Sequence, residues 1–254
     1  MAQKVVPRLA QREILLRQVP GLILGTDAAP HTRIIYVAHD HLNRDRGALR
    51  DANMATDVIV LVESARMTTG RNWHKERLFF LVSSARHFAT ELENSGFTVR
   101  YIQAPTTIDG LLIARAEFGY LPIVCAEPSS HRQFAQLAEY GVEFVPNDFF
   151  LTSRALFAQW ASPQKSFVME NFYRAQRVRL GILVENGKPF GERWNFDADN
   201  RLPPPKNYTW PPYLEHARDA VDRYVAAQFD HQLTTTWATT RAGALAQLDY
   251  FLEH

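Results

Sequence analysis

The strongest indication of fold class lies at Val58-Ile59-Val60-Leu61-Val62, an unbroken apolar run in a chain of 254 residues. A strand with one solvated face alternates apolar and polar side chains, whereas a strand inside a parallel sheet is apolar on both faces. Ile34-Ile35-Tyr36-Val37 has the same character, and shorter strand-like runs recur at 98–102, 123–126 and 143–145. The sequence therefore predicts a parallel sheet of about five strands.

Segments with helical periodicity separate these runs. Residues 73–94 place apolar side chains at steps of three and four and stop at Asn94-Ser95-Gly96, as a helix does. The segments 108–118 and 130–140 repeat the pattern, and the second of them stops at Gly141. Strands that alternate with helices predict an α/β fold, a Rossmann-like, doubly wound parallel sheet with right-handed crossovers.

The character of the chain changes after Phe150, so we expect an α/β domain at 33–150 and a helical and linker segment at 151–254. Prolines at 203–205 and 211–212 predict an extended linker, because neither a helix nor a central strand continues through them. Helical patterns precede and follow this linker, at 151–160, 167–183, 216–229 and 240–253.

The helix expected at 240–253 is apolar along one face, which includes Leu245, Leu248 and Phe251. Such a face needs something to cover it. Docking onto the sheet domain and docking onto a partner domain both satisfy this requirement.

The N-terminal extension, residues 1–32, carries no signal for secretion or membrane insertion, because charged residues from Lys4 to Arg17 interrupt its apolar positions. Apolar residues between Leu9 and Val19 predict a short helix that ends at Pro20. We expect either a docking or oligomer helix here, or a tail.

Composition and charge exclude several classes of protein. The net charge is +1, so no global field draws the chain to nucleic acid or membrane. The single cysteine, Cys125, excludes an internal disulfide and a multi-cysteine zinc or iron–sulfur site within this chain. Its apolar neighbours predict a small buried side chain, and a lone thiol fits a reducing cytoplasm.

Three carboxylates, Asp40, Glu63 and Glu127, follow directly after apolar runs. Ligands of open parallel sheets bind at the carboxyl ends of strands, beside the point where the strand order reverses. We therefore expect at least one of these carboxylates to contact a ligand.

The turn Ala38-His39-Asp40-His41 lacks glycine, which excludes Walker-type and dinucleotide phosphate loops after the first strand. His39 and His41 would face one metal ion if this segment were extended, but no further histidine has a fixed spacing to them. No Gly-x-Ser-x-Gly elbow is present. We therefore assign neither a metal site nor a catalytic residue.

A basic and aromatic cluster lies in the helical and linker segment. Arg174 and Arg177 would share one face of a helix, and the stretch Gly191–Arg201 adds Arg193 and Trp194 among turn-forming residues. These side chains either contact nucleic-acid phosphates or form an ion-pair network that holds the linker. The basic residues of the cluster are Lys165, Arg174, Arg177, Arg179, Lys188 and Arg193, against Glu170, Glu185 and Glu192.

Several stretches match one family in order along the chain. The most specific are Met169-Glu170-Asn171-Phe172-Tyr173-Arg174 and Gly191–Arg201. They resemble the photolyase-related proteins of the cryptochrome/photolyase superfamily, in particular the bacterial branch with an iron–sulfur cluster. The resemblance begins near Arg33 and covers the family's N-terminal half. Shorter matches are His39–Leu42, where the family favours Gly-Asp-Gln-Leu, then Trp73–Lys75, Ala85–Ala89, Glu127-Pro128 and Asp148–Leu151.

The resemblance implies a Rossmann-like domain that holds an antenna chromophore, a ribityl-lumazine, near the carboxyl ends of the first strands. Asp40, Glu63 and Leu81 are the candidates for this site by position. In the family, a C-terminal helical domain carries FAD, the cysteine ligands of the cluster and lesion-facing residues. Light there drives electron transfer from reduced flavin to a DNA photolesion.

Residues 240–253 resemble the first helix of that helical domain. We therefore expect a truncated, antenna-type module of a light-dependent DNA repair or photoreceptor system that is not catalytic by itself. Its expected partners are DNA, a separate helical flavin-domain chain or a second copy. The alternatives are a nucleic-acid- or protein-binding module without light chemistry and, less favoured because the phosphate loop is missing, a nucleotide-using enzyme. His39 replaces a glycine where an antenna would approach.

Overall fold

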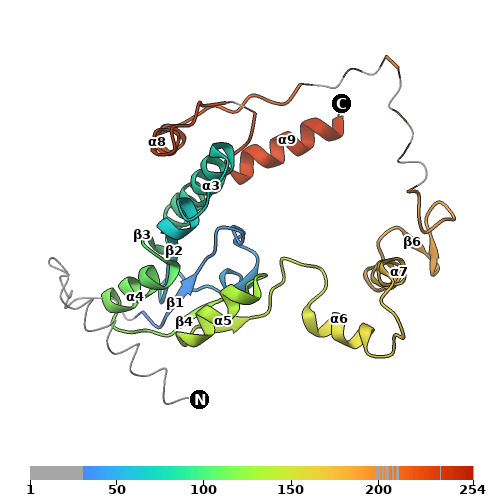
Figure 1. The fold of residues 1–254 in the computed structure, drawn as a ribbon, viewed down its shortest axis with the longest axis horizontal. Coiled ribbons are helices and arrows are strands. Elements are labelled where there is room, and N and C mark those ends of the chain that lie inside the picture. The colour runs from blue at the N-terminus through green and yellow to red at the C-terminus, as the bar shows by residue number, and fades with distance from the viewer. Residues whose placement is uncertain are drawn as a thin grey trace. The chain divides into compact units, whose positions relative to one another are not determined.

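The structure is a computed structural model that describes residues 31–197, 201, 203, 206–207, 209, 212–234 and 236–253. A five-stranded parallel sheet in the order β3-β2-β1-β4-β5 forms its core (Figure 1). The expected runs all form strands, and their parallel pairing confirms the predicted Rossmann-like α/β fold. The strands are β1 (Arg33–Tyr36), β2 (Asp57–Ser64), β3 (Thr98–Ala104), β4 (Ile123–Ala126) and β5 (Glu143–Val145).

Helices cover both faces of the sheet, which explains why the central strands lack polar alternation. Every residue of β2 is buried. Val58 and Val60 pack with α4 (Thr107–Glu117) on one face. Ile59, which points the other way, packs with α3 (Lys75–Asn94) on the opposite face. Each strand residue therefore contributes to one of two apolar layers.

The helices begin where the sequence offers a capping side chain. The Thr106 hydroxyl accepts a hydrogen bond from the Asp109 amide at the start of α4. Ser130 does the same for the Gln133 amide at the start of α5 (His131–Glu139). Two short helical turns lie in loops, the 3-10 turn η2 (Gly47–Leu49) and α2 (Ala65–Thr68).

Helix α8 (Ala220–Gln228) lies against α3, although the two are far apart in the sequence (Figure 1). Val225 and Ala226 pack on Phe79 and Val82 of α3. This small third apolar cluster fixes α8 to the sheet domain.

By its internal packing the chain divides into two compact units. The first, the sheet unit, runs to Phe149 and resumes at Tyr213–His254, and the second, the linker unit, is Phe150–Pro212. The linker unit contains α6 (Arg154–Ala161), α7 (Met169–Leu180) and a hairpin of β6 (Val184–Glu185) and β7 (Lys188–Pro189). Asn186 and Gly187 form the turn of this hairpin with φ of 50° and 76°, as a two-residue hairpin turn requires.

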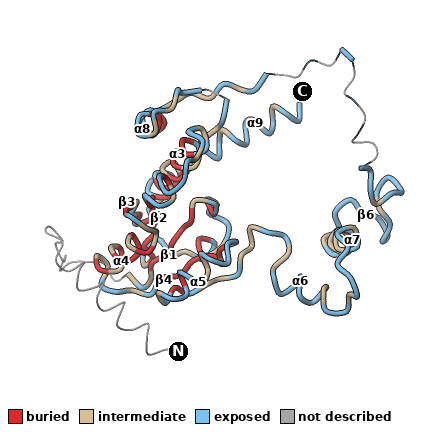
Figure 2. Tube along the Cα trace, viewed as in Figure 1, coloured by how far each residue is buried: buried red, intermediate tan, exposed pale blue. Residues whose placement is uncertain are grey.

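Helix α9 (Arg241–Glu253) contains no buried residue, and Figure 2 draws it without the colour of buried positions. The apolar face expected there remains exposed within the sheet unit.

The helix expected between Leu9 and Val19 lies outside the described residues, as do Asp199, Asn200 and part of the proline-rich linker.

Candidate functional site

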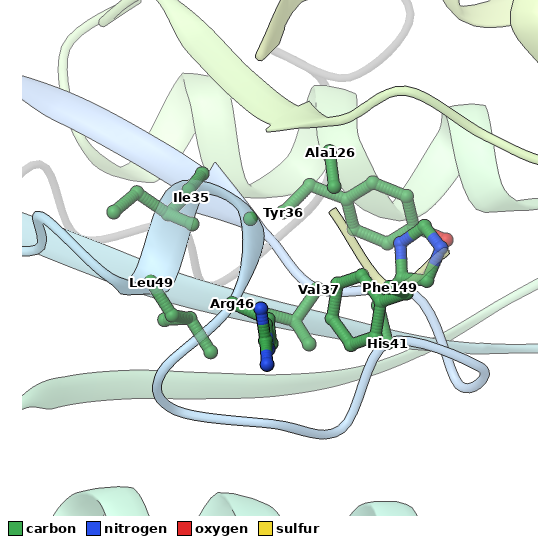
Figure 3. A pocket seen from close by; sticks show the side chains of 10 residues that line it. Ile35, Tyr36, Val37, His41, Arg46, Leu49, Ala126 and Phe149 are labelled. Atoms are coloured by element: carbon green, nitrogen blue, oxygen red, sulfur yellow. The ribbon is translucent and has the colours of Figure 1, made fainter. Parts of the chain in front are cut away.

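The strand order reverses between β1 and β4, because the chain moves outward from β1 to β2 and β3 and then returns to β4. Parallel α/β sheets bind ligands at the carboxyl ends of the strands beside such a reversal. A small hollow lies at this edge, between Ile35, Leu49, Ala126 and the polar side chains of Arg46 and His41 (Figure 3). We refer to it as the switch-point hollow.

Two stacked rings close the switch-point hollow. The His41 imidazole lies flat against the Phe149 ring, with centroids 4.4 Å apart and planes 14° apart (Figure 3). Asp148 holds this loop in place, because its carboxylate accepts a 2.7 Å hydrogen bond from the Gly47 amide and pairs with Arg50. The closure is therefore fixed from both β1 and the loop after β5.

Gly47 sits at the wall of the hollow with φ of +57°, and a Cβ there would lie 2.8 Å from the Ala126 Cβ. Both the left-handed backbone and the close approach require glycine. The loop from Gly47 therefore packs directly on the end of β4.

The two histidines after β1 face different surroundings. The segment forms a turn in which the His41 amide donates to the Ala38 carbonyl at 2.9 Å. The segment is therefore not extended, so the geometry that would let both rings face one metal ion does not form. His39 lies near Glu63 and Arg86 instead, and burial lowers the pKa of His39 to about 4.

The Nε2 atoms of His39 and His41 are both buried and have no hydrogen-bond partner among the described residues. Most buried polar atoms are paired. An edge of the sheet with two buried ring nitrogens that lack hydrogen-bond partners is therefore unusual for a protein interior.

Glu63, at the end of β2, is 4% exposed, and both oxygens of its carboxylate are hydrogen-bonded. Its oxygens accept hydrogen bonds from Tyr101, Gln103, Gln228 and Arg86 at 2.7–2.9 Å. Burial raises the pKa of Glu63, but these hydrogen bonds and the Arg86 charge outweigh it and hold the pKa below its usual value. Because a carboxylate has about four acceptor positions, Glu63 has none left for a ligand.

The other position-based candidates lie elsewhere. Asp40 is exposed, Leu81 is half-buried on α3, and Glu127 is half-buried after β4. Neither Asp40, Glu63 nor Leu81 lines the switch-point hollow. The structure places Asp40 in the turn after β1, Glu63 near the end of β2 and Leu81 on α3, and brings none of them to that hollow.

Arg177 on α7 is the one buried residue among the described residues of the linker unit, with 6% exposure. Its guanidinium donates to the carbonyls of Ile182, Leu183 and Trp194. It also lies over the Tyr173 ring at 5.5 Å. Arg177 therefore joins α7 to both the hairpin and the stretch that follows it.

The remaining candidates of the basic cluster surround this centre. Arg174 pairs with Glu170 at 2.8 Å and lies over the Trp194 ring at 5.9 Å. Glu170 also accepts a 3.0 Å hydrogen bond from Asn195. Arg193 lies 4.5 Å over the Phe196 ring. The stretch from Gly191 is thus held through its rings and through contacts to α7.

One group of possible metal ligands occurs in the described part of the chain, formed by His87, Asp219 and Asp222. The two imidazole nitrogens face different carboxylates, at 3.6 Å and 3.3 Å. Asp222 is also occupied by Arg218 and by the Thr239 hydroxyl. The group holds α8 to α3, because its polar atoms already have partners.

No helix in the described part of the chain is long and apolar enough to cross a membrane.

The profile of the family described as deoxyribodipyrimidine photo-lyase-related protein matches residues 35–242. The chain belongs to this family. A (6-4) photolyase from Agrobacterium fabrum is 29% identical to it over 249 residues, which cover 87% of this chain and 48% of that photolyase. The photolyase-related chain thus spans about half the length of this curated relative.

Sequence reasoning missed several residues of the photolyase-related chain's sheet edge. Phe149 and Asp148 were noted as a family match, but nothing in their spacing showed that they close the end of β1. The partners of Glu63 come from three separate elements, so only the fold brings them together. The pair Asn186-Gly187 typically forms a two-residue hairpin turn, so this hairpin was predictable from the sequence.

Proposed function

We propose that this chain is the Rossmann-like module of a light-dependent, photolyase-related system for DNA repair or light sensing, and that it works with a flavin-bearing helical partner. The family match over 35–242 and the 29% identity to a (6-4) photolyase support the proposal. The sheet unit supplies a rigid frame whose two faces are already covered. Its contribution is binding and positioning.

The iron–sulfur cluster that the resemblance implies does not fit this chain. Cys125 is its one cysteine and is buried in the sheet. Burial raises the pKa of the Cys125 thiol to about 12, so the thiolate that a cluster needs is disfavoured. No step is therefore derived through the cluster or through FAD.

The ribityl-lumazine does not fit the switch-point hollow while His41 is stacked on Phe149. Small-molecule sites occupy roughly 300–1,000 Å³, and the cavity in the hollow is only about 10 Å³. The apolar wall suits a flat heteroaromatic ligand once the His41 ring swings out. We propose antenna binding at this hollow in that open arrangement.

Substitution of His41 tests the antenna proposal. His41→Ala removes the stacked ring, so we expect lumazine to bind the variant at least tenfold more tightly than the unmodified chain, followed by absorption and fluorescence titration. His131→Ala, on the exposed start of α5, is the matched control and leaves the affinity unchanged. Equal affinity in all three proteins would remove the hollow as the antenna site.

Purification of the tagged chain from its own host tests the partner proposal. We expect a second chain in equal amount, with flavin absorption in the same fractions, identified by mass spectrometry. A colourless chain that purifies alone and takes up neither flavin nor lumazine would contradict the proposal.

A second candidate function is a binding module without light chemistry. It is favoured by the linker unit, which exposes apolar side chains that ordinarily mark interaction surfaces. These include Phe150, Leu151, Phe157, Phe167, Met169 and Phe190.

DNA-binding measurements test one form of this second function, in which the module binds nucleic acid. If the basic cluster contacts phosphates, Arg174→Ala and Arg193→Ala weaken binding of labelled DNA, and the affinity falls steeply with salt. Arg177→Ala is unsuitable because Arg177 holds the unit together. Arg132→Ala, exposed on α5, is the control. DNA affinity that ignores salt and both substitutions would exclude this form.

A further inference from the structure

Helix α9 exposes an apolar stripe. Leu245, Leu248, Phe251 and Leu252 are 47%, 51%, 64% and 72% exposed. The spacing of Leu245, Leu248 and Leu252 at three and four residues places them on one face, as in a helix that packs against another surface. Within its own unit, α9 accepts a 2.9 Å hydrogen bond at Gln247 from the Leu214 amide.

The second half of α9 is acidic as well as apolar. Asp249 and Glu253 are exposed, lie one turn apart, and pair with no cation among the described residues. The stripe therefore suits a surface that is apolar and basic.

The sheet unit contains such a surface at the start of α3, which we name the α3 surface: Arg71, Trp73, Arg77, Phe80 and Trp237. Phe80 and Trp237 contact edge to face, with centroids 6.3 Å apart, and are 37% and 55% exposed. Arg77 and Arg71 lie over the Trp73 ring at 4.5 Å and 5.8 Å.

The charge of the α3 surface is uncompensated. Neither Arg71 nor Arg77 pairs with a carboxylate in the part of the chain that the structure describes. The neighbouring Glu76 is already engaged by His231 at 2.5 Å. Aromatic and arginine side chains are also the residues that contribute most to protein interfaces.

We propose that two copies of this chain associate by exchanging α9, so that α9 of each copy packs its apolar stripe on the α3 surface of the other. Asp249 and Glu253 then face Arg71 and Arg77 across the interface. A two-fold arrangement repeats each contact, as isologous dimers require. One 13-residue helix is only about 20 Å long, so the repetition is needed to approach the ~1,200 Å² of a specific interface.

The inference is independent of flavin, lumazine and light, so its failure leaves the proposed function standing. The test is sedimentation velocity of the full chain from low to high micromolar concentration, with a shift from monomer to twice the monomer mass expected. Leu248→Glu abolishes the shift. Because Leu248 is half exposed, the variant keeps its circular dichroism and melting temperature.

A charge exchange tests the pairing itself. Arg77→Glu and Glu253→Arg each weaken the dimer by about fivefold or more, since like charges then meet, and the double variant recovers most of the loss. Arg132→Glu on α5 is the control and has no effect. A chain that is monomeric throughout, a dimer that ignores Leu248→Glu, or single losses that the double variant does not recover would each overturn the proposal. A monomer that binds a separate helical chain through the α3 surface would also overturn it.

Discussion

The sheet unit and the linker unit are stabilised in opposite ways. The sheet unit buries apolar side chains in two layers, one on each face of the sheet. The linker unit buries a single described residue, Arg177, and that residue is charged. Figure 2 shows this contrast, with buried positions concentrated in the sheet and α3 and exposed ones along α6 and α7.

The difference shows how much each unit depends on something outside itself. Burial of apolar area is the dominant favourable contribution to folding, and the sheet unit has it. The linker unit relies on hydrogen bonds, cation–π contacts and a group of touching rings, Phe157, Trp160, Phe167 and Phe172. We infer that it reaches full stability when a partner covers its exposed rings.

Removal of Arg177 changes the structure most, because it is expected to unfold one of the two units. Arg177→Ala leaves three carbonyls without their donor and removes the cation between two rings. We expect a loss of about 3 kcal/mol, enough to unfold the linker unit while the sheet unit stays folded. Limited proteolysis followed by mass spectrometry would show new cleavage confined to 150–212. Arg179→Ala, on the exposed side of the same helix, is the control. Cleavage spread evenly over both units would contradict this account.

Within the sheet unit, Glu63 is the most sensitive polar position. The Glu63 carboxylate accepts hydrogen bonds from four donors, whereas the amide of Gln in Glu63→Gln has only one oxygen to accept them. The substitution also leaves Arg86 without its counter-charge. We expect a destabilisation of about 4 kcal/mol, as for other broken buried pairs, measured by urea unfolding.

Glu117→Gln is the control for this substitution, because Glu117 pairs with Arg100 at the surface. We expect it to change the stability by less than about 1 kcal/mol. Similar losses of unfolding free energy in the two variants would show that the hydrogen bonds around Glu63 contribute no more than a surface ion pair.

The buried His39 makes the sheet unit sensitive to acid. An unfolded histidine titrates near pH 6.5, whereas burial lowers the pKa of His39 to about 4 in the folded protein. Between these values the unfolded chain binds a proton that the folded chain does not. The stabilisation is therefore complete above pH 6.5 and is lost as the pH falls toward 4, by at most about 3 kcal/mol.

His39→Gln reduces this pH dependence, and His41, whose pKa burial also lowers, accounts for part of what remains. His131→Gln, at an exposed position, retains the full dependence. Glu63 acts in the same direction but at lower pH, because its pKa lies below the usual value of 4.5. Urea unfolding at a series of pH values measures both. An unchanged slope between pH 6.5 and 4 in His39→Gln would contradict the burial of His39.

The smallest expected effect concerns Cys125, whose reactivity with thiol reagents reports on the packing of the sheet alone. Because the thiol is buried and its pKa is raised to about 12, we expect thiol reagents to leave it unmodified in the folded chain and to react fully in urea. Rapid labelling of the native chain would contradict the packing of β4.

The sequence predicted the sheet unit better than the linker unit for a physical reason. Strands such as β2 are apolar throughout because both faces are covered, and that pattern is local. The role of Arg177 depends on carbonyls from a hairpin and a loop that only the folded chain brings together. Neither composition nor spacing reveals such contacts.

The candidate site, like the linker unit, is only partly predictable from the sequence. Asp40, Glu63 and Glu127 were selected because they follow apolar runs, and each does follow its strand or lie near its end. Whether a carboxylate at that edge is available to a ligand depends on its partners, and Glu63 is fully bonded. The His41–Phe149 stack joins residues too distant in sequence for spacing to reveal.

Hydrogen–deuterium exchange of the full chain, followed residue range by residue range, tests the central contrast most directly. We predict slow exchange through β1, β2, α3 and α4, and fast exchange through α6, α7 and the β6–β7 hairpin in the isolated chain. Protection of the linker unit equal to that of the sheet unit, in a chain shown to be free of any partner, would contradict the account.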